Sequence, residues 1–222
     1  MTKNIIESKG CHPRNYISYS QLVCWERTPE LYKRKYFHGE QQRTNRGQAL
    51  GKQFAEAIEH DKESGDLVMD IVIAQFPKFE IRDKEILANM SVGKGRDRKF
   101  IHILIKPDTT QKDYKAFKEY KTGDVSTPWT QKRVDEDDQM TFYFTGLYLK
   151  IKELGGTSIP TGELVWAPTE KVVGEDGVER PQLTGDIKWF PTTRDIADIL
   201  RMQARISTAW REIGQAMESE IL

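Results

Sequence analysis

The stretch Ile103-Leu104-Ile105-Lys106-Pro107-Asp108 places an aspartate just after an apolar run, and Glu119-Tyr120-Lys121-Thr122-Gly123 follows after ten intervening residues. An apolar run of this length is typical of a strand. Side chains at positions i and i+2 of a strand project from the same face, so we expect Glu119 and Lys121 to project together while Tyr120 turns away. If the two strands are neighbours, Asp108 reaches the same pocket.

These residues offer the ligands of a magnesium site. Two carboxylates, from Asp108 and Glu119, and the backbone carbonyl of Tyr120 are hard oxygen ligands, and Mg²⁺ usually takes its remaining ligands from water and phosphate. A bound metal makes hydroxide available near neutral pH, and Lys121 would orient the attacking water or stabilise the developing charge. The pattern predicts a phosphodiester-cleaving centre. Glu–Lys ion pairs are also common on exposed strands, so a purely structural pair remains the alternative.

The flanking sequence predicts helices on both sides of these strands. Ser18 and Ser20 are residues suited to cap a helix, and Pro29 interrupts the helix that follows them. Further along the chain, Glu175-Asp176-Gly177 is typical of a hairpin turn. The apolar stripe of the last helix is expected to pack on the chain's own sheet rather than on a partner helix. Helices are expected at residues 17–37, 46–60 and 139–154 and along Ile199, Met202, Ile206, Ala209, Ile213 and Ala216. An antiparallel meander of three strands is expected at 78–82, 100–106 and 114–121, and further strands are expected at 162–166 and 183–190.

Length and composition indicate one globular domain over residues 1–222, with 31% charged and 37% hydrophobic residues. The formal net charge is zero, so overall charge does not argue for nucleic acid. Two local clusters, Lys33-Arg34-Lys35 and the basic residues between Lys94 and Lys99, could neutralise phosphates or form balanced, solvated faces. The chain has no apolar run of membrane-spanning length and no secretory signal at its start, which favours the cytoplasm and no membrane contact.

With these motifs the chain resembles the PD-(D/E)XK nuclease superfamily, and within it the branch of RecB-type nuclease domains and CRISPR-associated exonucleases. The resemblance implies an α/β (α+β) fold with a restriction-endonuclease-like core, in which helices flank a central mixed β-sheet between an N-terminal helical segment and a long C-terminal helix. The matching stretches cover most of the chain: Tyr16 to Leu22 with Thr28-Pro29 and Tyr32 to Tyr36 as the opening helix, Asp108 as the motif aspartate, Glu119 and Lys121 as the E-x-K pair, and Gln139 with Tyr143 as the Gln-and-Tyr helix.

The resemblance also implies supporting residues. Gln139 and Tyr143 lie four apart on one helix face, where they would bind DNA or position the catalytic lysine, or else only cap the packing of the helix on the sheet. The helix at 46–60 is the family's usual source of another metal ligand, but Gly51 stands where many relatives have histidine. Glu56 or Glu59 could supply a carboxylate instead, and Glu59 lies nearer the glycine face, although either is more often plain helix surface.

Cysteine content separates this chain from some relatives. Those relatives hold an iron–sulfur cluster through four cysteines, three of them toward the end, whereas the two cysteines here are Cys11 and Cys24. We therefore expect ordinary thiols and no iron–sulfur cluster.

The expected activity is that of a Mg²⁺- or Mn²⁺-dependent deoxyribonuclease, an exonuclease by resemblance. It would act in recombination, repair or phage and mobile-element DNA processing, in a bacterial or phage-infected cell, with DNA and a recombination or replication protein as partners. Two alternatives stay open: a catalytically inactive nucleic-acid-binding module that keeps the nuclease fold, and an adaptor that binds a partner through its C-terminal helix.

Overall fold

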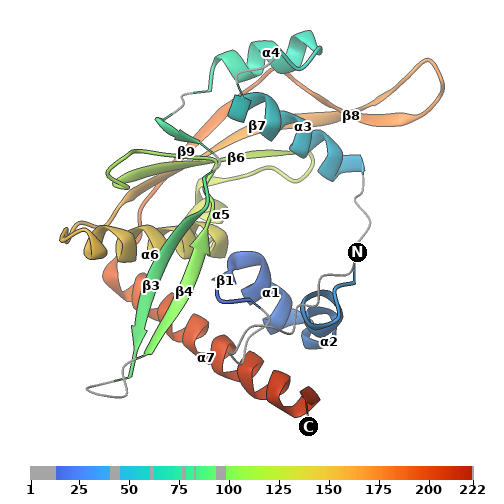
Figure 1. Cartoon of the computed structure of the whole chain (residues 1–222). Coiled ribbons are helices and arrows are strands. Elements are labelled where there is room, and N and C mark those ends of the chain that lie inside the picture. The colour runs from blue at the N-terminus through green and yellow to red at the C-terminus, as the bar shows by residue number, and fades with distance from the viewer. Residues whose placement is uncertain are drawn as a thin grey trace.

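The computed structural model describes residues 14–40, 46–60, 63–76, 79–82, 84–93 and 99–221, without the side chains of residues 46–49, 59 and 221. A mixed β-sheet lies at the centre, helices cover both of its faces, and a long helix forms the C-terminal end (Figure 1). This arrangement confirms the expected α+β fold class and is consistent with a restriction-endonuclease-like core.

The strands form two groups. A three-stranded sheet has the order β1-β4-β3, and a six-stranded sheet has the order β2-β5-β6-β7-β8 with β9 also paired to β7. β6 and β7 run parallel, and the other pairs of the second sheet are antiparallel. The strands are β1 (Ile17–Ser18), β2 (Ile81–Arg82), β3 (Ile86–Val92), β4 (Lys99–Ile105), β5 (Thr109–Thr110), β6 (Ala116–Asp124), β7 (Thr161–Val173), β8 (Glu179–Leu183) and β9 (Lys188–Thr192).

The helices follow the apolar periodicity of the sequence, with two short additions. Helices were expected for all but α4 and α5, whose few turns carry little periodic signal. The helices are α1 (Tyr19–Arg27), α2 (Pro29–Tyr32), the π-helix Lys33–Phe37, α3 (Arg46–His60), α4 (Leu67–Ala74), α5 (Gln131–Asp135), α6 (Asp138–Glu153) and α7 (Ile196–Ile221).

The N-terminal helical segment is broken where its sequence predicts. Ser18 caps α1 through a capping box in which its backbone N–H donates to Gln21 Oε1 at 2.9 Å. Ser20 lies inside α1 and does not cap it. The helix ends before Pro29, which occupies the first position of α2, where its missing N–H costs nothing.

The prediction of an antiparallel meander at 78–82, 100–106 and 114–121 is wrong. β3 was not expected, and it pairs with β4 in place of the neighbours that the meander assigned. β6 belongs to the other sheet, where it pairs with β5 and β7. Its parallel partner is more than 35 residues away in the sequence, so local patterning could not reveal the pairing. Residues 78 and 83 lie outside the described part of the chain.

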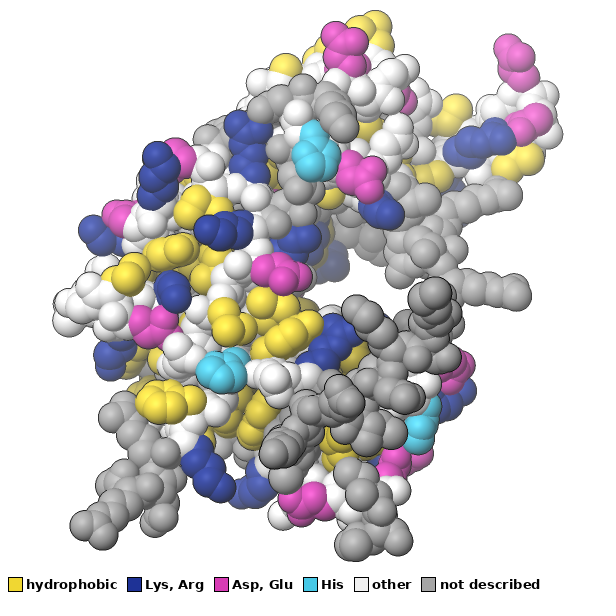
Figure 2. All heavy atoms as spheres, in the orientation of Figure 1, with side chains coloured by type: hydrophobic (Ala, Val, Ile, Leu, Met, Phe, Trp, Pro, Cys, Tyr) yellow, Lys and Arg dark blue, Asp and Glu magenta, His cyan; other side chains and the backbone are white. Residues whose placement is uncertain are grey.

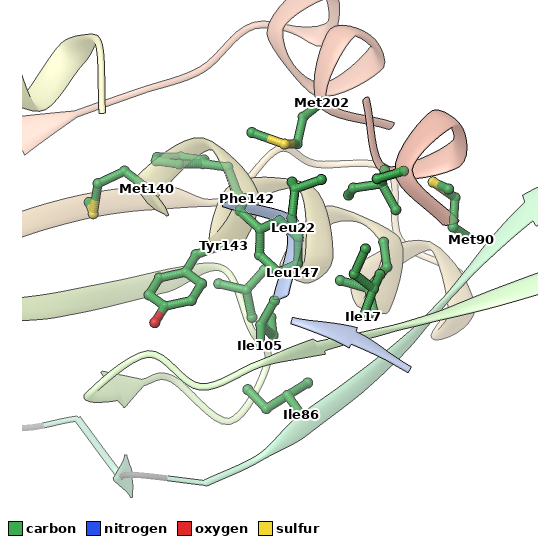
Figure 3. Close-up of a cluster of buried hydrophobic side chains, with 14 of the residues drawn as sticks. Ile17, Leu22, Ile86, Met90, Ile105, Met140, Phe142, Tyr143, Leu147 and Met202 are labelled. Carbon is green, nitrogen blue, oxygen red and sulfur yellow. The ribbon is translucent and has the colours of Figure 1, made fainter. Parts of the chain in front are cut away.

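Two apolar cores occupy opposite faces of the second sheet. On one face α6 packs over Phe117, Leu164 and Trp166, and this core continues to α7, to the first sheet and to α1. Part of it, including Ile17, Ile105 and Leu147, is drawn in Figure 3. On the other face α3 and α4 pack over Tyr120, Val165 and Ala167. Neighbouring residues of β6 and β7 therefore face different cores.

The C-terminal helix packs on the chain itself, but mainly on α6 and α1 rather than on the sheet as predicted. Its stripe of Ile199, Met202, Ile206, Ala209 and Ile213 is buried, and Arg205 ties it to Glu26 of α1 and Asp138 of α6 at 2.8 Å each. The strand expected at 183–190 is instead divided between β8 and β9, with Gly185 at φ 92° between them. The hairpin turn at Asp176-Gly177 joins β7 to β8.

No helix in the described ranges is both long enough and apolar enough to cross a membrane. On the face shown in Figure 2, acidic and basic side chains are interspersed, in keeping with the zero formal net charge. Cys24 is a free, partly buried thiol, and Cys11 lies outside the described residues.

Candidate active site

Asp108 reaches β6 by way of a short strand. β4 ends at Ile105, and β5 begins directly after Asp108 and pairs antiparallel with β6, with Thr109 opposite Lys118. The backbone N–H of Tyr120 donates to Asp108 Oδ2 at 2.6 Å. The carboxylate of Asp108 therefore lies at the edge of β6, beside the residues that flank Tyr120.

Glu119 and Lys121 project from one face of β6, as their spacing predicts. Lys121 Nζ donates to Glu119 Oε1 at 2.6 Å. Tyr120 turns to the opposite face, where its ring meets Phe76 edge-on with 4.9 Å between centroids. The three motif residues thus converge on one edge of the strand, although β4 and β6 are not paired neighbours.

Helix α6 adds Gln139 and Tyr143 to this group. Gln139 Nε2 donates to Glu119 Oε1 at 2.9 Å and to Tyr143 Oη at 2.8 Å, while Gln139 Oε1 accepts from Lys121 Nζ at 3.1 Å. Asp137 caps the helix by accepting from Met140 N at 2.8 Å, which fixes where the helix starts. The hydroxyl of Tyr143 points away from the apolar cluster (Figure 3).

Burial and charge act in opposite directions on Lys121. Burial alone would lower the pKa of Lys121, but the carboxylates of Glu119, Asp108 and Asp137 outweigh burial and raise this pKa above its usual range. Burial, and then the charge of Glu119, raise the pKa of the Tyr143 phenol well above its usual range. Lys121 is therefore an ammonium and Tyr143 a neutral phenol at neutral pH.

One carboxylate oxygen of Glu119 distinguishes this group from an ordinary ion pair. The residue is 4% exposed, and both hydrogen bonds that it accepts go to Oε1. Its other oxygen, Oε2, is buried and has no hydrogen-bond partner among the described residues. A buried carboxylate oxygen left unbonded is costly, and a divalent cation would satisfy it.

The residues present fit such a cation. Asp108 supplies a second carboxylate, and the Tyr120 carbonyl faces the same edge of β6 as the Tyr120 N–H that binds Asp108, because both groups of a strand residue point the same way. Within the described ranges, no group of three or more His, Cys, Asp or Glu side chains is placed to hold a metal. The remaining ligands would come from water or phosphate, as is usual for Mg²⁺.

Among the described residues, helix α3 adds no further metal ligand to the site. Gly51 lies against Thr122, a residue of β6 that alternates onto the face opposite Glu119 and Lys121. Glu56 is exposed and pairs with Lys52 at 3.6 Å. The side chain of Glu59 lies outside the described residues, so its place as a metal ligand stays a prediction.

The basic cluster Lys33-Arg34-Lys35 is largely balanced by acids, which favours the solvated-face alternative. Lys33 pairs with Glu30 at 3.1 Å and Glu220 at 3.6 Å, and Arg34 pairs with Glu40 at 3.6 Å. Of the other basic cluster, between Lys94 and Lys99, only Lys99 lies within the described residues, where it is exposed at the start of β4.

Sequence reasoning missed two buried polar residues beside this group. Arg194, 7% exposed, donates to Thr141 and to the backbone carbonyls of Val134 and Asp137, and so holds the junction of α5 and α6 in place. Trp166 sits opposite Lys121 on β7, in an apolar run that indicates only a buried strand. Neither belongs to a motif that local spacing could have revealed.

No protein-family model matches the chain, and no curated protein matches it. Among solved structures, the chain is similar to a phage-related exonuclease from Haemophilus somnus 129PT, with 12% identity, a TM-score of 0.49, and coverage of 86% of this chain and 81% of that one. It is also similar to SSO0001, with 14% identity, a TM-score of 0.39, and coverage of 88% and 77%. These likenesses are too distant to indicate an activity, so a function must be argued from the residues of the site.

Proposed function

We propose that this protein is a metal-dependent DNA nuclease that hydrolyses phosphodiester bonds. The observation that carries the proposal is the unpartnered, buried Oε2 of Glu119, placed beside a second carboxylate and a lysine. A purely structural Glu–Lys pair has no reason to leave that oxygen unbonded. A site for Mg²⁺ or Mn²⁺ explains it.

Each residue has a distinct role in this proposal. Asp108, Glu119 and the carbonyl of Tyr120 hold the cation, which when bound supplies a nucleophile at neutral pH and offsets negative charge on the phosphate. Lys121 holds its ammonium where it can orient the attacking water or stabilise the same charge.

Gln139 and Tyr143 position these groups. Gln139 bonds to Glu119, Lys121 and Tyr143 at once, and therefore fixes the two reacting side chains relative to each other. The family resemblance also allows the same amide and phenol a part in DNA binding.

The finer parts of the proposal rest on the family resemblance in the sequence. These parts are that the substrate is DNA rather than another phosphodiester, that cleavage starts from an end, and that the protein acts in recombination, repair or phage and mobile-element DNA processing. A partner from recombination or replication belongs to the same proposal.

A cleavage assay tests the proposal. Labelled linear and circular DNA is incubated with Mg²⁺ or Mn²⁺ and the wild type, Asp108→Ala or Lys121→Ala. Lys118→Ala is a matched control, because Lys118 lies on the same strand but on the opposite face. We expect wild type and Lys118→Ala to cut linear DNA and both site variants to fail. Cleavage that persists in both site variants contradicts the assignment, and cleavage of circular DNA contradicts the exonuclease.

A second candidate function is a nucleic-acid-binding module that keeps the fold without the chemistry. It is favoured by the lack, within the described ranges, of a third acidic or histidine side chain beside Asp108 and Glu119. Binding of DNA by the wild type without cleavage under any of the metal conditions would support this function over the nuclease.

A further inference from the structure

A second buried polar atom lies unpartnered on the face of the sheet that carries Glu119. Trp166 is 1% exposed, and its indole Nε1 has no hydrogen-bond partner among the described residues. An indole N–H can only donate, and buried donors in folded proteins nearly always have an acceptor. An acceptor is therefore missing next to this atom.

Strand register puts Trp166 in line with two lysines. Trp166 on β7 pairs with Lys121 on β6 and with Lys188 on β9, and residues paired across strands project from the same face. The ammonium of Lys188 lies 5.4 Å from the centre of a Trp166 ring. Trp166 thus lies between two lysines on one face of the sheet, which favours an anion as the missing acceptor.

Gly123 lies next to the indole N–H of Trp166 and has no side chain. A Cβ added to Gly123 would lie 3.4 Å from Trp166 Nε1, with no other such atom within 4 Å. Gly123 is not among the glycines with positive φ, so its backbone conformation does not require glycine. A glycine in a strand interior often marks the close approach of a ligand, and here a side chain would fill the space in front of the indole.

The position of this space relates it to the proposed cleavage site. Gly123 follows Glu119 and Lys121 on the same face of β6, four residues beyond Glu119, which is roughly 13 Å along a strand. A nucleic-acid strand that follows β6 from a scissile phosphate at Glu119 would carry a more distant phosphate past Gly123.

We propose that the indole N–H of Trp166 donates a hydrogen bond to an oxygen of a phosphodiester beyond the scissile one, at the position where Gly123 has no side chain. This inference rests on the proposed nuclease function and adds a substrate-binding residue to it. Lys188, which is exposed and lies over the indole ring, would move aside or bind the same phosphate.

Nuclear magnetic resonance of the ¹⁵N-labelled wild type tests the hydrogen bond directly. The chain has five tryptophans, and Trp166→Phe assigns the Trp166 indole signal. A short single-stranded oligonucleotide is added with Ca²⁺ in place of Mg²⁺ to prevent hydrolysis. We expect the Trp166 indole proton to shift downfield and to exchange more slowly with water, while the Trp189 signal on the opposite face does not change.

A double-mutant cycle gives an independent measure. Trp166→Phe removes the donor together with part of the buried ring, and Gly123→Ala places a methyl group in front of the donor without changing the packing of the indole core. Each is expected to weaken oligonucleotide binding about five- to tenfold with little change in kcat, and the double variant should be no weaker than either single one. Trp189→Phe is the matched control with unchanged binding.

The outcomes separate the two proposals. An unchanged Trp166 signal in a wild type that binds the oligonucleotide, or additive losses in the cycle, overturns the role of Trp166 and leaves the nuclease intact. A wild type that neither binds nor cleaves DNA overturns the proposed function itself.

Discussion

Strand β6 carries two lysine–glutamate pairs, one on each face, and they differ in how completely they are bonded. On one face Lys118 pairs with Glu163 of β7, and its ammonium lies 5.2 Å from the ring of Phe79 and 5.5 Å from that of Trp189. On the other face Lys121 pairs with Glu119. Within the described residues, the first pair has no buried polar atom without a partner, whereas the second leaves Glu119 Oε2 unbonded.

The difference shows what distinguishes a structural ion pair from a candidate active site. Both pairs join a lysine of β6 to a glutamate in close contact, so neither the residue types nor the contact identifies a site. What differs is the unsatisfied carboxylate oxygen and the second carboxylate, Asp108, at the same edge. The Lys118–Glu163 pair therefore supplies a matched control for every substitution in the Glu119–Lys121 pair.

The largest expected effect is on cleavage. Glu119→Gln should lower kcat on linear DNA by on the order of 10³-fold or more, because the amide cannot replace a charged metal ligand. Glu163→Gln should keep kcat within about twofold of wild type, since it removes the same charge from the other face. Equal losses in both variants would mean that the two faces do not differ in function.

Lysine substitutions should give a smaller difference. Lys121→Met is expected to lower kcat roughly 10²-fold, which is typical for removing one group that stabilises transition-state charge. Lys118→Met removes an ammonium that is 14% exposed and faces away from the site, and should leave kcat nearly unchanged. Single-turnover cleavage rates measure both. If the Lys121→Met enzyme cleaves DNA as fast as wild type, Lys121 takes no part in the chemical step.

The phenol of Tyr143 should contribute less again. Tyr143→Phe deletes the hydroxyl that accepts from Gln139 Nε2, while Gln139 keeps its bonds to Glu119 and Lys121. Loss of one positioning hydrogen bond corresponds to a drop of about three- to tenfold in kcat. Rates measured at saturating DNA test this value, and a loss as large as that of Glu119→Gln would instead give Tyr143 a direct part in the reaction.

The smallest expected effect is on stability without metal. Glu163→Gln should lower the free energy of unfolding by about 1 kcal/mol, because it breaks a partly buried ion pair. Glu119→Gln should change this free energy less, since losing the attraction of Lys121 is offset by removing an unbonded buried charge. Urea unfolding in the presence of a chelator compares the two variants. A larger loss for Glu119→Gln would indicate that its carboxylate is mainly structural.

The sequence predicts well those features that depend on local spacing. The i, i+2 spacing of Glu119 and Lys121 and the i, i+4 spacing of Gln139 and Tyr143 put each pair on one face, and the structure places them there. The stripe of α7 likewise predicts a helix buried on its own chain, although the helix lies mainly on α6 and α1 rather than on the predicted sheet. These features need only the geometry of a single element.

Features that depend on pairing between distant segments could not be predicted in this way. The position of Asp108 was expected to follow from neighbouring strands, but it depends on β5, which is two residues long. The parallel pairing of β6 with β7 places Trp166 beside Lys121, and nothing in the run Leu164 to Ala167 indicates an unsatisfied donor. Unbonded buried atoms become visible only when the packing around them is known.

Calorimetric titration with Mn²⁺ tests the central claim most directly, since that claim concerns a cation at Glu119 and Asp108. Wild type, Glu119→Gln, Asp108→Asn and Glu163→Gln are titrated without DNA. We predict binding of Mn²⁺ to wild type and Glu163→Gln, and a loss of at least about tenfold in affinity for Glu119→Gln and Asp108→Asn. Equal Mn²⁺ affinity in all four proteins, or none in the wild type, would contradict the account.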